Sequence, residues 1–333
     1  MNPLENLVNL ANLPTPIHKM ATMTEELKGP ELYIKRDDLT GVAFSGNKVR
    51  KLEYSCFHAL ENGFDTLITC GGLQSNHARA TAAAAAKLGM KCHLVLGGEK
   101  PSLPEGNLFL DRMLGTSVTY AEGYTLIETE DLMKNIAEDY RKKGFNPCLI
   151  PLGASDSTGS LGYVRAVKEM MEQFSTSGFE PDHIICPTGS GGTLAGMLAG
   201  KAIFGLSSII TGFSVAFDSE TVKGRVLDIM AAIRKDYFPE MEICEKDINV
   251  NDLYIGEGYT RTTREQLSLI KDVAEKEALI FDPVYTGKAF YGLAQEISKK
   301  TWNKKEKLLF LHTGGIFGLF PYREMINEVL VQD

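Results

Sequence analysis

The segment DHIICPTGSGGTLAG, residues 182–196, gives the strongest indication of the fold class. Its first part is a short apolar run typical of a buried strand, and its second part is a glycine-rich turn that leads into a helical pattern. Such a turn presents backbone N–H groups to an anion such as phosphate, and the helix dipole adds to the attraction. Thr188, Ser190 and Thr193 add hydroxyl donors. The segment therefore predicts an α/β protein with a phosphate site.

The glycine turn differs from two common phosphate-binding motifs. No Lys-Ser or Lys-Thr pair follows the glycines, so the turn is not a P-loop. Leu194 stands where the dinucleotide-binding fingerprint has its third Gly or Ala. A nucleotide-dependent oxidoreductase is therefore kept only as an alternative function, and a plain turn between a strand and a helix is the structural alternative.

The alternation of strand and helix patterns continues along the chain. Apolar runs such as DTLITC, KCHLVLG and KLLFLHT are separated by longer helical patterns such as SNHARATAAAAAKLG and TREQLSLIKDVAEKE. This order predicts mostly parallel, twisted sheets flanked by helices on both faces. No Gly/Pro/Ser-rich linker divides the sequence, so we expect a chain with two domains to cross between them more than once.

Composition limits the partners and the compartment. The 333 residues are 44% hydrophobic and 23% charged, which is ordinary for a soluble globular protein. The formal net charge of −8 argues against nucleic acid or an anionic membrane as a partner. We find no signal-peptide pattern at the N-terminus and no apolar run approaching the ~20 residues of a membrane span, so we expect a cytoplasmic protein. The six cysteines form no C-x-x-C pair, and no set of His and Cys has zinc-type spacing. We expect the cysteines to be reduced, with no metal site.

Three further loops follow strand-like runs or carry glycines, and the carboxyl ends of strands are where α/β sheets bind ligands. In GGLQSNHARA, residues 71–80, Ser75 and Asn76 either cap the next helix or face a ligand. We expect His77 to be a surface or supporting residue. The other two loops are DPVYTGKAF, residues 282–290, and LHTGGIFGLF, residues 311–320, in which His312 is expected to be structural.

The segment GVAFSGNKVRKLEYSCF, residues 41–57, places Lys48 and Lys51 one turn apart at the start of a predicted helix. Helix N-termini disfavour cations. Either these lysines form a solvated face or an anion binds beside them. A phosphate cradle, an amine and few other charges together suit pyridoxal 5′-phosphate (PLP), because a lysine can form a Schiff base with it while the ring acts as an electron sink.

Five segments together resemble the family of D-cysteine desulfhydrase and 1-aminocyclopropane-1-carboxylate (ACC) deaminase, PLP enzymes of fold type II that are similar to the tryptophan synthase β subunit. They are GNKVRKLEY, GGLQSNHARA, TGSGGTLAG, DPVYTGKAFYG and LHTGG, in this order. The resemblance implies a homodimer whose subunits have two α/β domains with PLP between them. The smaller domain would span residues 51–161, and the larger would combine residues 1–50 with residues 162–333.

The resemblance also implies residues for the cofactor. Lys48 would carry PLP, Lys51 would pair with its phosphate, and Asn76 would accept a hydrogen bond from the phenolic oxygen or donate one to it. Thr286 and Thr313 would lie near the pyridine nitrogen. The phosphate would be held by Thr188, Gly189, Ser190, Gly191, Gly192 and Thr193.

The implied reaction is a β-elimination that converts D-cysteine, or a related β-substituted amino acid, to pyruvate, ammonia and hydrogen sulfide. Ser75 would contact the substrate carboxylate, and Lys48 or a neighbouring group would take the Cα proton. Tyr285 would lie close to the reacting substrate, and Tyr259 matches the family's second active-site tyrosine.

Two other activities within the family stay open. ACC deaminases resemble this chain but have Glu and Leu at the positions of Thr286 and Thr313, and a threonine gives the pyridine nitrogen only a neutral hydrogen bond. ACC deaminase is therefore disfavoured. An L-cysteate sulfo-lyase would need an extra cation for the sulfonate, which Arg261 would supply unless it is a surface residue. A non-catalytic PLP- or amino-acid-binding protein is a further alternative.

Overall fold

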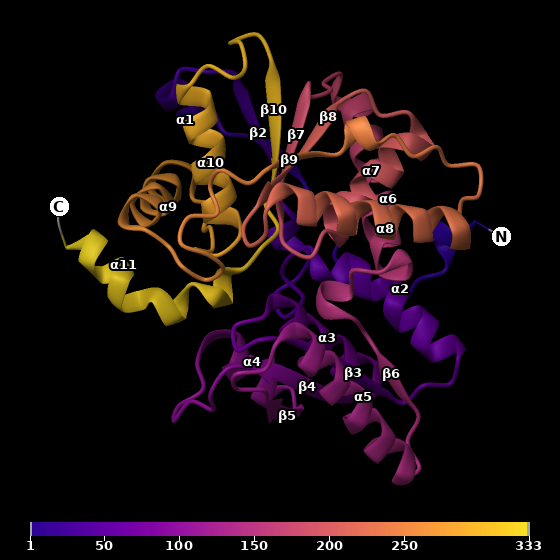
Figure 1. Cartoon of the computed structure of the whole chain (residues 1–333). Coiled ribbons are helices and arrows are strands. Elements are labelled where there is room, and N and C mark those ends of the chain that lie inside the picture. Colours follow the sequence, from indigo (N-terminus) through magenta and orange to yellow (C-terminus); the bar gives the residue numbers. More distant parts are fainter. Residues whose placement is uncertain (1, 332–333) are drawn as a thin grey trace.

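The computed structural model describes residues 2–331, which form two sheets flanked by helices (Figure 1). The larger sheet has six strands in the order β1-β2-β10-β7-β8-β9. Its neighbouring strands run parallel, apart from the antiparallel pair β1 and β2. The strands are β1 (Ile17–Lys19), β2 (Glu31–Lys35), β7 (His183–Thr188), β8 (Ile209–Ser214), β9 (Asn249–Asn251) and β10 (Lys307–Leu311).

The smaller sheet has four parallel strands in the order β5-β4-β3-β6. They are β3 (Thr66–Gly72), β4 (Lys91–Gly97), β5 (Ser117–Tyr120) and β6 (Pro147–Leu149). The larger sheet takes its strands from both sides of this stretch of sequence, so the chain passes from one sheet to the other and back. The α/β prediction with mostly parallel sheets is confirmed, while the domain boundaries at residues 51 and 161 stay a prediction.

Helices cover both faces of the larger sheet, because successive side chains of its buried strands point to opposite faces. In β10, Leu309 and Leu311 pack on one face and Leu308 and Phe310 pack on the other. The first face is covered by α6 (Ser157–Ser177), α7 (Gly192–Phe204) and α8 (Ser219–Asp236). The second is covered by α1 (Ala21–Leu27), α9 (Arg264–Glu277), α10 (Thr286–Ser298) and α11 (Arg323–Leu330).

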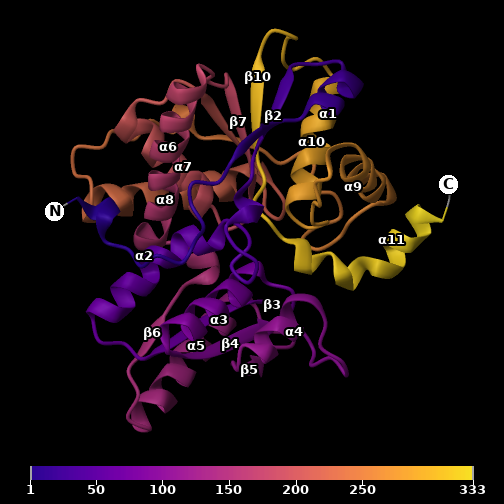
Figure 2. The same cartoon turned by 180° about the vertical axis from the view of Figure 1, so that it is seen from behind.

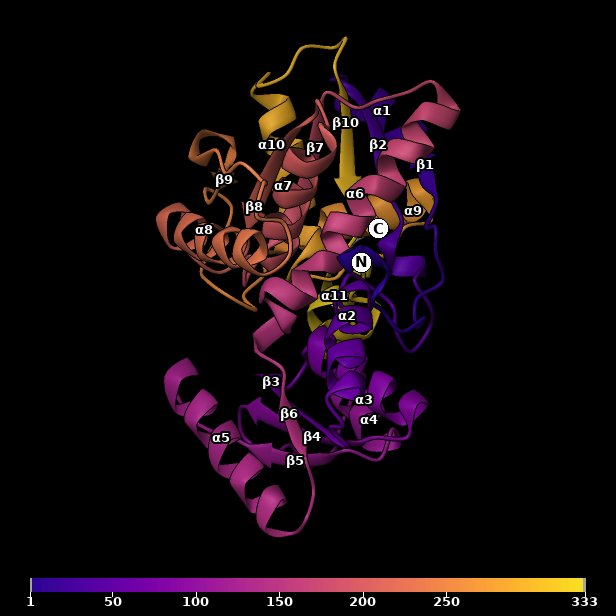
Figure 3. The same ribbon diagram turned by 90° about the vertical axis from the view of Figure 1, so that its right-hand side faces the viewer.

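The smaller sheet is covered in the same way. Leu67 and Leu94 pack towards α2 (Lys48–Glu61), α3 (Asn76–Leu88) and α4 (Gly106–Met113), whereas Ile68 and Val95 pack towards α5 (Leu126–Lys142). Helix α2 also packs against α6 of the larger part. Figures 2 and 3 show α2 at the junction of the two parts. Lys48, the first residue of this helix, therefore lies at the junction of the two parts.

The remaining elements are short 3-10 helices: η1 (Pro3–Glu5), η2 (Asp37–Leu39), η3 (Leu152–Ala154), η4 (Glu245–Asp247), η5 (Ile316–Gly318) and η6 (Phe320–Tyr322). Within residues 2–331, no helix has both the length and the apolarity to cross a bilayer. The same residues contain no cluster of three or more His, Cys, Asp or Glu side chains that is suited to a metal ion. All six cysteines are free, and each except Cys244 is buried.

Candidate active site

A cavity of about 410 Å³ lies at the carboxyl ends of β3, β7 and β10. Parallel α/β sheets bind ligands at this edge. The loop after β3, the glycine loop after β7 and the start of α2 all line the cavity. The predicted site residues that line it are Lys48, Ser75, Asn76, Thr188, Gly189, Ser190, Gly191, Thr193, Tyr259, Tyr285 and Thr313.

Lys51 and Gly192 do not line the cavity. Lys51 lies behind the glycine loop, to which Gly192 belongs. The Lys51 Nζ donates to the Gly153 carbonyl at 2.6 Å and to Ser155 Oγ at 2.9 Å. Ser155 Oγ in turn lies 2.7 Å from Ser190 Oγ. A Cβ atom at position 192 would be only 2.4 Å from the Lys51 Nζ, so glycine permits this close approach. Lys51 thus places a buried amine behind the loop.

Thr286 also lies outside the cavity lining, and its contact with the cofactor stays a prediction. It is the first residue of α10 and is fully buried. Its hydroxyl donates to Asp282 Oδ1 at 2.7 Å and accepts from the Asp282 N–H at 2.8 Å. Asp282 also accepts from the N–H groups of Val284 and Tyr285. Thr286 therefore belongs to a turn that begins α10 and positions Tyr285.

Lys48 occupies the first helical position of α2, and its amine faces the cavity. Its Nζ donates to Asn47 Oδ1 at 2.9 Å and lies 5.7 Å from the centre of the Tyr285 ring. Burial lowers the pKa of Lys48 to about 8, against the opposing influence of the Asp282 carboxylate. At pH 7 roughly a tenth of Lys48 is therefore a neutral, nucleophilic amine, far more than for a lysine with the ordinary pKa of 10.5.

The start of α2 is tied to the glycine loop and to the loop after β10. Asn47 Nδ2 donates to Thr193 Oγ1 at 2.9 Å, and the Asn47 N–H donates to the Thr313 carbonyl at 3.1 Å. Gly46 makes this possible, because it has a φ of +109° and a Cβ there would be 2.5 Å from the Thr313 oxygen. These bonds hold Lys48 beside the glycine loop and the loop after β10.

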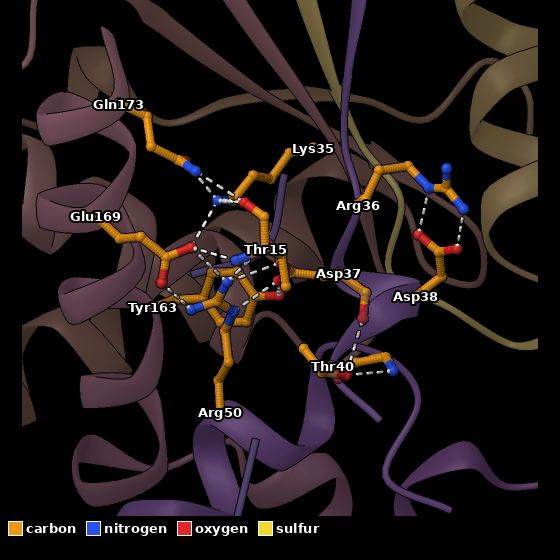
Figure 4. A network of polar contacts seen from close by, with 11 residues as sticks. Thr15, Lys35, Arg36, Asp37, Asp38, Thr40, Arg50, Tyr163, Glu169 and Gln173 are labelled. Atoms are coloured by element: carbon orange, nitrogen blue, oxygen red, sulfur yellow. Dashed lines mark hydrogen bonds and ion pairs between the residues drawn. The ribbon is translucent and has the colours of Figure 1, made fainter. Parts of the chain in front are cut away.

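A buried charge network anchors α2 two residues beyond Lys48 (Figure 4). Arg50 Nε and one of its terminal nitrogens each donate to Asp37 at 2.8 Å, and its other terminal nitrogen donates to Glu169 at 2.9 Å. The Tyr163 hydroxyl donates to Asp37 at 2.6 Å. Lys35 joins by donating to Glu169 at 2.6 Å. The network thus links β2, η2 and α6 to the helix that carries Lys48.

His77 is buried and lines the cavity, so it is not a surface residue. Its Nε2 lies 2.8 Å from Thr69 Oγ1, whose single hydrogen is donated to the Ile150 carbonyl at 2.8 Å. His77 Nε2 must therefore carry the hydrogen, which leaves Nδ1 as an acceptor. Nδ1 has no hydrogen-bond partner within the described part of the chain. Burial, with the charges of Lys48 and Lys51, holds the pKa of His77 well below its usual value, so the ring is neutral.

Tyr259 and Tyr285 form a pair at the cavity, with their hydroxyl oxygens 2.6 Å apart. Loss of water around the hydroxyl raises the pKa of both phenols, although 42% of Tyr259 is exposed, and both are protonated at neutral pH. Lys288, which sequence reasoning missed, holds the loop that leads to Tyr259: its Nζ donates to the Ile255 and Gly258 carbonyls at 2.9 and 2.8 Å. The Tyr322 hydroxyl holds the other side by donating to the Thr260 carbonyl at 2.7 Å.

The charges at the site are few. Among the described residues, Lys48 is the only Lys, Arg, Asp or Glu that lines the cavity. Arg261 is exposed and lies outside the lining, in the loop beyond Tyr259. His312 is buried and its Nδ1 accepts from the Gly314 N–H at 3.2 Å, as expected of a structural histidine.

These residues fit PLP. The glycine loop offers hydroxyl groups and the N–H groups at the start of α7 to a phosphate, with no carboxylate in the lining to repel it. Lys48 offers an amine with a lowered pKa to an aldehyde. When bound, PLP would be held by Lys48, Asn76 and the glycine loop, and its ring would withdraw electrons from the α-carbon of an amino acid.

Comparison with known proteins agrees with this fit. Residues 8–314 match the sequence model of the family described as "Pyridoxal-phosphate dependent enzyme". The chain is 39% identical over 324 residues to the putative 1-aminocyclopropane-1-carboxylate deaminase of Pyrococcus abyssi, covering 97% of this chain and 96% of that protein. It is 40% identical over 335 residues to the mitochondrial bifunctional D-cysteine desulfhydrase/1-aminocyclopropane-1-carboxylate deaminase of Arabidopsis thaliana, covering 97% and 81%.

Comparison with solved structures indicates the same family and fold. A structure described as an ACC deaminase homologue superposes with a TM-score of 0.89 at 37% identity, covering 97% of this chain and 96% of that one. A threonine deaminase isoform from Solanum lycopersicum, at 19% identity and a TM-score of 0.67, covers 98% and 85% and shares the fold. The chain therefore belongs to the PLP-dependent enzymes of fold type II, in the family of ACC deaminase and D-cysteine desulfhydrase.

Proposed function

We propose that this protein is a carbon–sulfur lyase that converts D-cysteine and water to pyruvate, ammonia and hydrogen sulfide. The observation that carries the proposal is the charge of the cavity, in which Lys48 is the only Lys, Arg, Asp or Glu of the described residues. Cysteine brings one carboxylate and a small thiol. L-Cysteate would bring a second anion, the sulfonate, for which this lining has no further cation because Arg261 lies outside it.

ACC deaminase is the second candidate, because the relatives described above carry that activity in their names. The lack of a carboxylate among the described lining residues weighs against it. A carboxylate beside the pyridine nitrogen would keep it protonated and make the ring a stronger electron sink. Thr313, which lines the cavity, offers only a hydroxyl. Elimination from cysteine begins with loss of an acidic Cα proton, whereas ACC has no such proton and needs the stronger sink.

The chain supplies the groups that elimination requires. Ser75 Oγ accepts from the Ala78 N–H at 3.1 Å, so its own hydrogen is free to be donated to the substrate carboxylate at the start of α3. Neutral Lys48 takes the Cα proton. The Tyr259–Tyr285 pair shares one hydroxyl hydrogen within the pair and keeps the other, which it donates to the departing sulfur. The homodimer and the cytoplasmic location stay predictions.

The test is a screen for release of 2-oxo acid and ammonia from D-cysteine, L-cysteine, β-chloro-D-alanine, L-cysteate and ACC. We expect kcat/KM for D-cysteine to exceed that for ACC and for L-cysteate by about tenfold or more, which corresponds to ~1.4 kcal/mol of transition-state binding. Activity on ACC alone would overturn the proposed substrate and the argument from Thr286 and Thr313. Activity on L-cysteate above that on D-cysteine would overturn the argument from cavity charge.

A pH prediction follows from the lowered pKa of Lys48. The amine attacks the PLP aldehyde only when neutral, so the rate of covalent PLP uptake by the cofactor-free protein should rise with pH and reach half its maximum near pH 8. An ordinary lysine would place this midpoint near 10.5. The measurement is the growth of the visible absorbance band after mixing, with Lys48→Ala as the blank. A midpoint above pH 10 would contradict the effect of burial.

A further inference from the structure

Asn76 lines the cavity, and its amide is held from behind by a second asparagine. Asn107 Nδ2 donates to Asn76 Oδ1 at 3.0 Å. Asn107 is completely buried in α4 and does not line the cavity. The contact matters because an amide presents a donor on one side and an acceptor on the other. Which side Asn76 shows to a ligand therefore depends on how Asn107 is oriented.

Two groups of fixed polarity determine the orientation of Asn107. On one side, Arg79 Nε lies 2.9 Å from Asn107 Oδ1, and a guanidinium only donates. On the other side, Asn107 Nδ2 lies 2.9 Å from the Gln74 carbonyl, which only accepts. The Asn107 N–H also donates to Gln74 Oε1 at 2.9 Å. Rotating the Asn107 amide by 180° would set donor against donor and acceptor against acceptor, so one orientation is fixed.

Arg79 is itself held rigidly. It is fully buried, donates to the carbonyls of Ala43 and Ser45 in the loop before Lys48, and lies over the Phe317 ring at 5.2 Å. Burial lowers the pKa of Arg79 only to about 10, so it stays charged at neutral pH. Arg79 therefore connects α3 with α4 and with the segment that leads into Lys48.

We propose that Arg79 and Asn107 are positioning residues that fix Asn76 as a hydrogen-bond donor towards the cofactor. With its Oδ1 bonded to Asn107, Asn76 has only its Nδ2 group left for the cavity, and that group has no other partner among residues 2–331. A donor there stabilises the phenolic oxygen of PLP as an anion. The sequence left open whether Asn76 donates or accepts, and the Arg79–Asn107 relay selects the donor.

The test is Asn107→Asp, which keeps the size of the side chain and its acceptor for Arg79 but removes both donors. The carboxylate would repel Asn76 Oδ1, so Asn76 would turn and present its oxygen to the phenolic oxygen. We expect the visible band of bound PLP to move towards the near-ultraviolet, where the protonated phenol absorbs. We expect PLP to bind about 10- to 100-fold more weakly, as for the loss of one hydrogen bond to a charged group. The matched control is Asn303→Asp, which makes the same change at an exposed residue before the amino end of β10, the end away from the cavity. It should leave the spectrum and the affinity for PLP unchanged.

Asn76→Asp serves as the direct comparison, because it removes the same donor at its source. A similar spectral shift and a similar loss of affinity in Asn76→Asp and Asn107→Asp support the relay. A shift in Asn76→Asp with an unchanged spectrum and unchanged affinity in Asn107→Asp would overturn it. If Asn107→Asp lacks the native circular dichroism spectrum, Asn107→Ala replaces it, and the visible band should then shift partway. The inference rests on the PLP site, but neither measurement depends on which amino acid is the substrate.

Discussion

Replacing Lys48 by alanine is expected to lower kcat by about 1,000-fold or more, because the change removes both the covalent attachment of the cofactor and the base for the Cα proton. No second lysine among the described residues lines the cavity and could take its place. Lys51 is held behind the glycine loop by Gly153 and Ser155. Substrate turnover and the visible absorbance of the purified protein are the two measurements.

The matched control for Lys48 is Lys168→Ala, which removes an exposed lysine from α6. The control should keep both the visible band and full turnover. Retention of the visible band in Lys48→Ala, with kcat within tenfold of the unaltered protein, would show that another amine carries the cofactor.

Replacing Asp37 by asparagine is expected to lower the free energy of unfolding by about 3–5 kcal/mol, the usual cost of removing one partner of a buried ion pair. Asp37 is fully buried and accepts from Thr15, from Tyr163 and twice from Arg50. Asparagine would turn a donor towards one of these donors and leave the buried Arg50 with Glu169 as its remaining charge partner. The measurement is urea unfolding followed by circular dichroism.

Asp38→Asn is the matched control for Asp37→Asn. Asp38 pairs with Arg36, and both side chains are partly exposed, at 16% and 15%. Water reaches this pair in part, so we expect a smaller loss than for Asp37→Asn, about 1–2 kcal/mol. Equal losses for the two variants would mean that the network in Figure 4 contributes no special stability.

Because Arg50 lies two residues beyond Lys48, a smaller turnover number should accompany the loss of stability in Asp37→Asn.

The stability contributed by Asp37 has a defined pH dependence. Burial alone would raise the pKa of this carboxyl, but the charges of Arg50 and Lys35, together with the hydrogen bonds from Arg50 and Tyr163, outweigh burial and hold the pKa below its ordinary value. The contribution is therefore complete above the carboxyl range of the unfolded chain and is lost as the pH falls through the lower pKa of the folded state.

The sequence predicted those parts of the site that local patterns encode. The strand, glycine turn and helix at residues 182–196 are recognisable from neighbouring residues, and the carboxyl-end rule predicts a ligand beside Ser75 and Asn76. The place of Lys48 in the same site came from the family resemblance. Thr286 lies outside the cavity lining, so its place near the cofactor stays a prediction. Asp282, four residues before Thr286, indicated a capping turn in the sequence, and in this turn the Thr286 hydroxyl is hydrogen-bonded to Asp282.

The supporting residues could not be predicted, because their partners are distant in the sequence. Lys288 binds main-chain carbonyls some 30 residues away, at Ile255 and Gly258. Asn107 contacts Arg79 from another helix. A carbonyl group is present at every residue, so no sequence pattern marks the one that a buried lysine or amide will bind.

The most direct test of the account is to locate the amine that carries the cofactor. The purified yellow protein is reduced with borohydride, digested, and the peptide that bears the pyridoxyl group is identified by mass spectrometry. We predict a single modified site at Lys48, the first residue of α2, with D-cysteine able to discharge the visible band before reduction. A pyridoxyl group on Lys51, or a protein that takes up no PLP, would contradict the account.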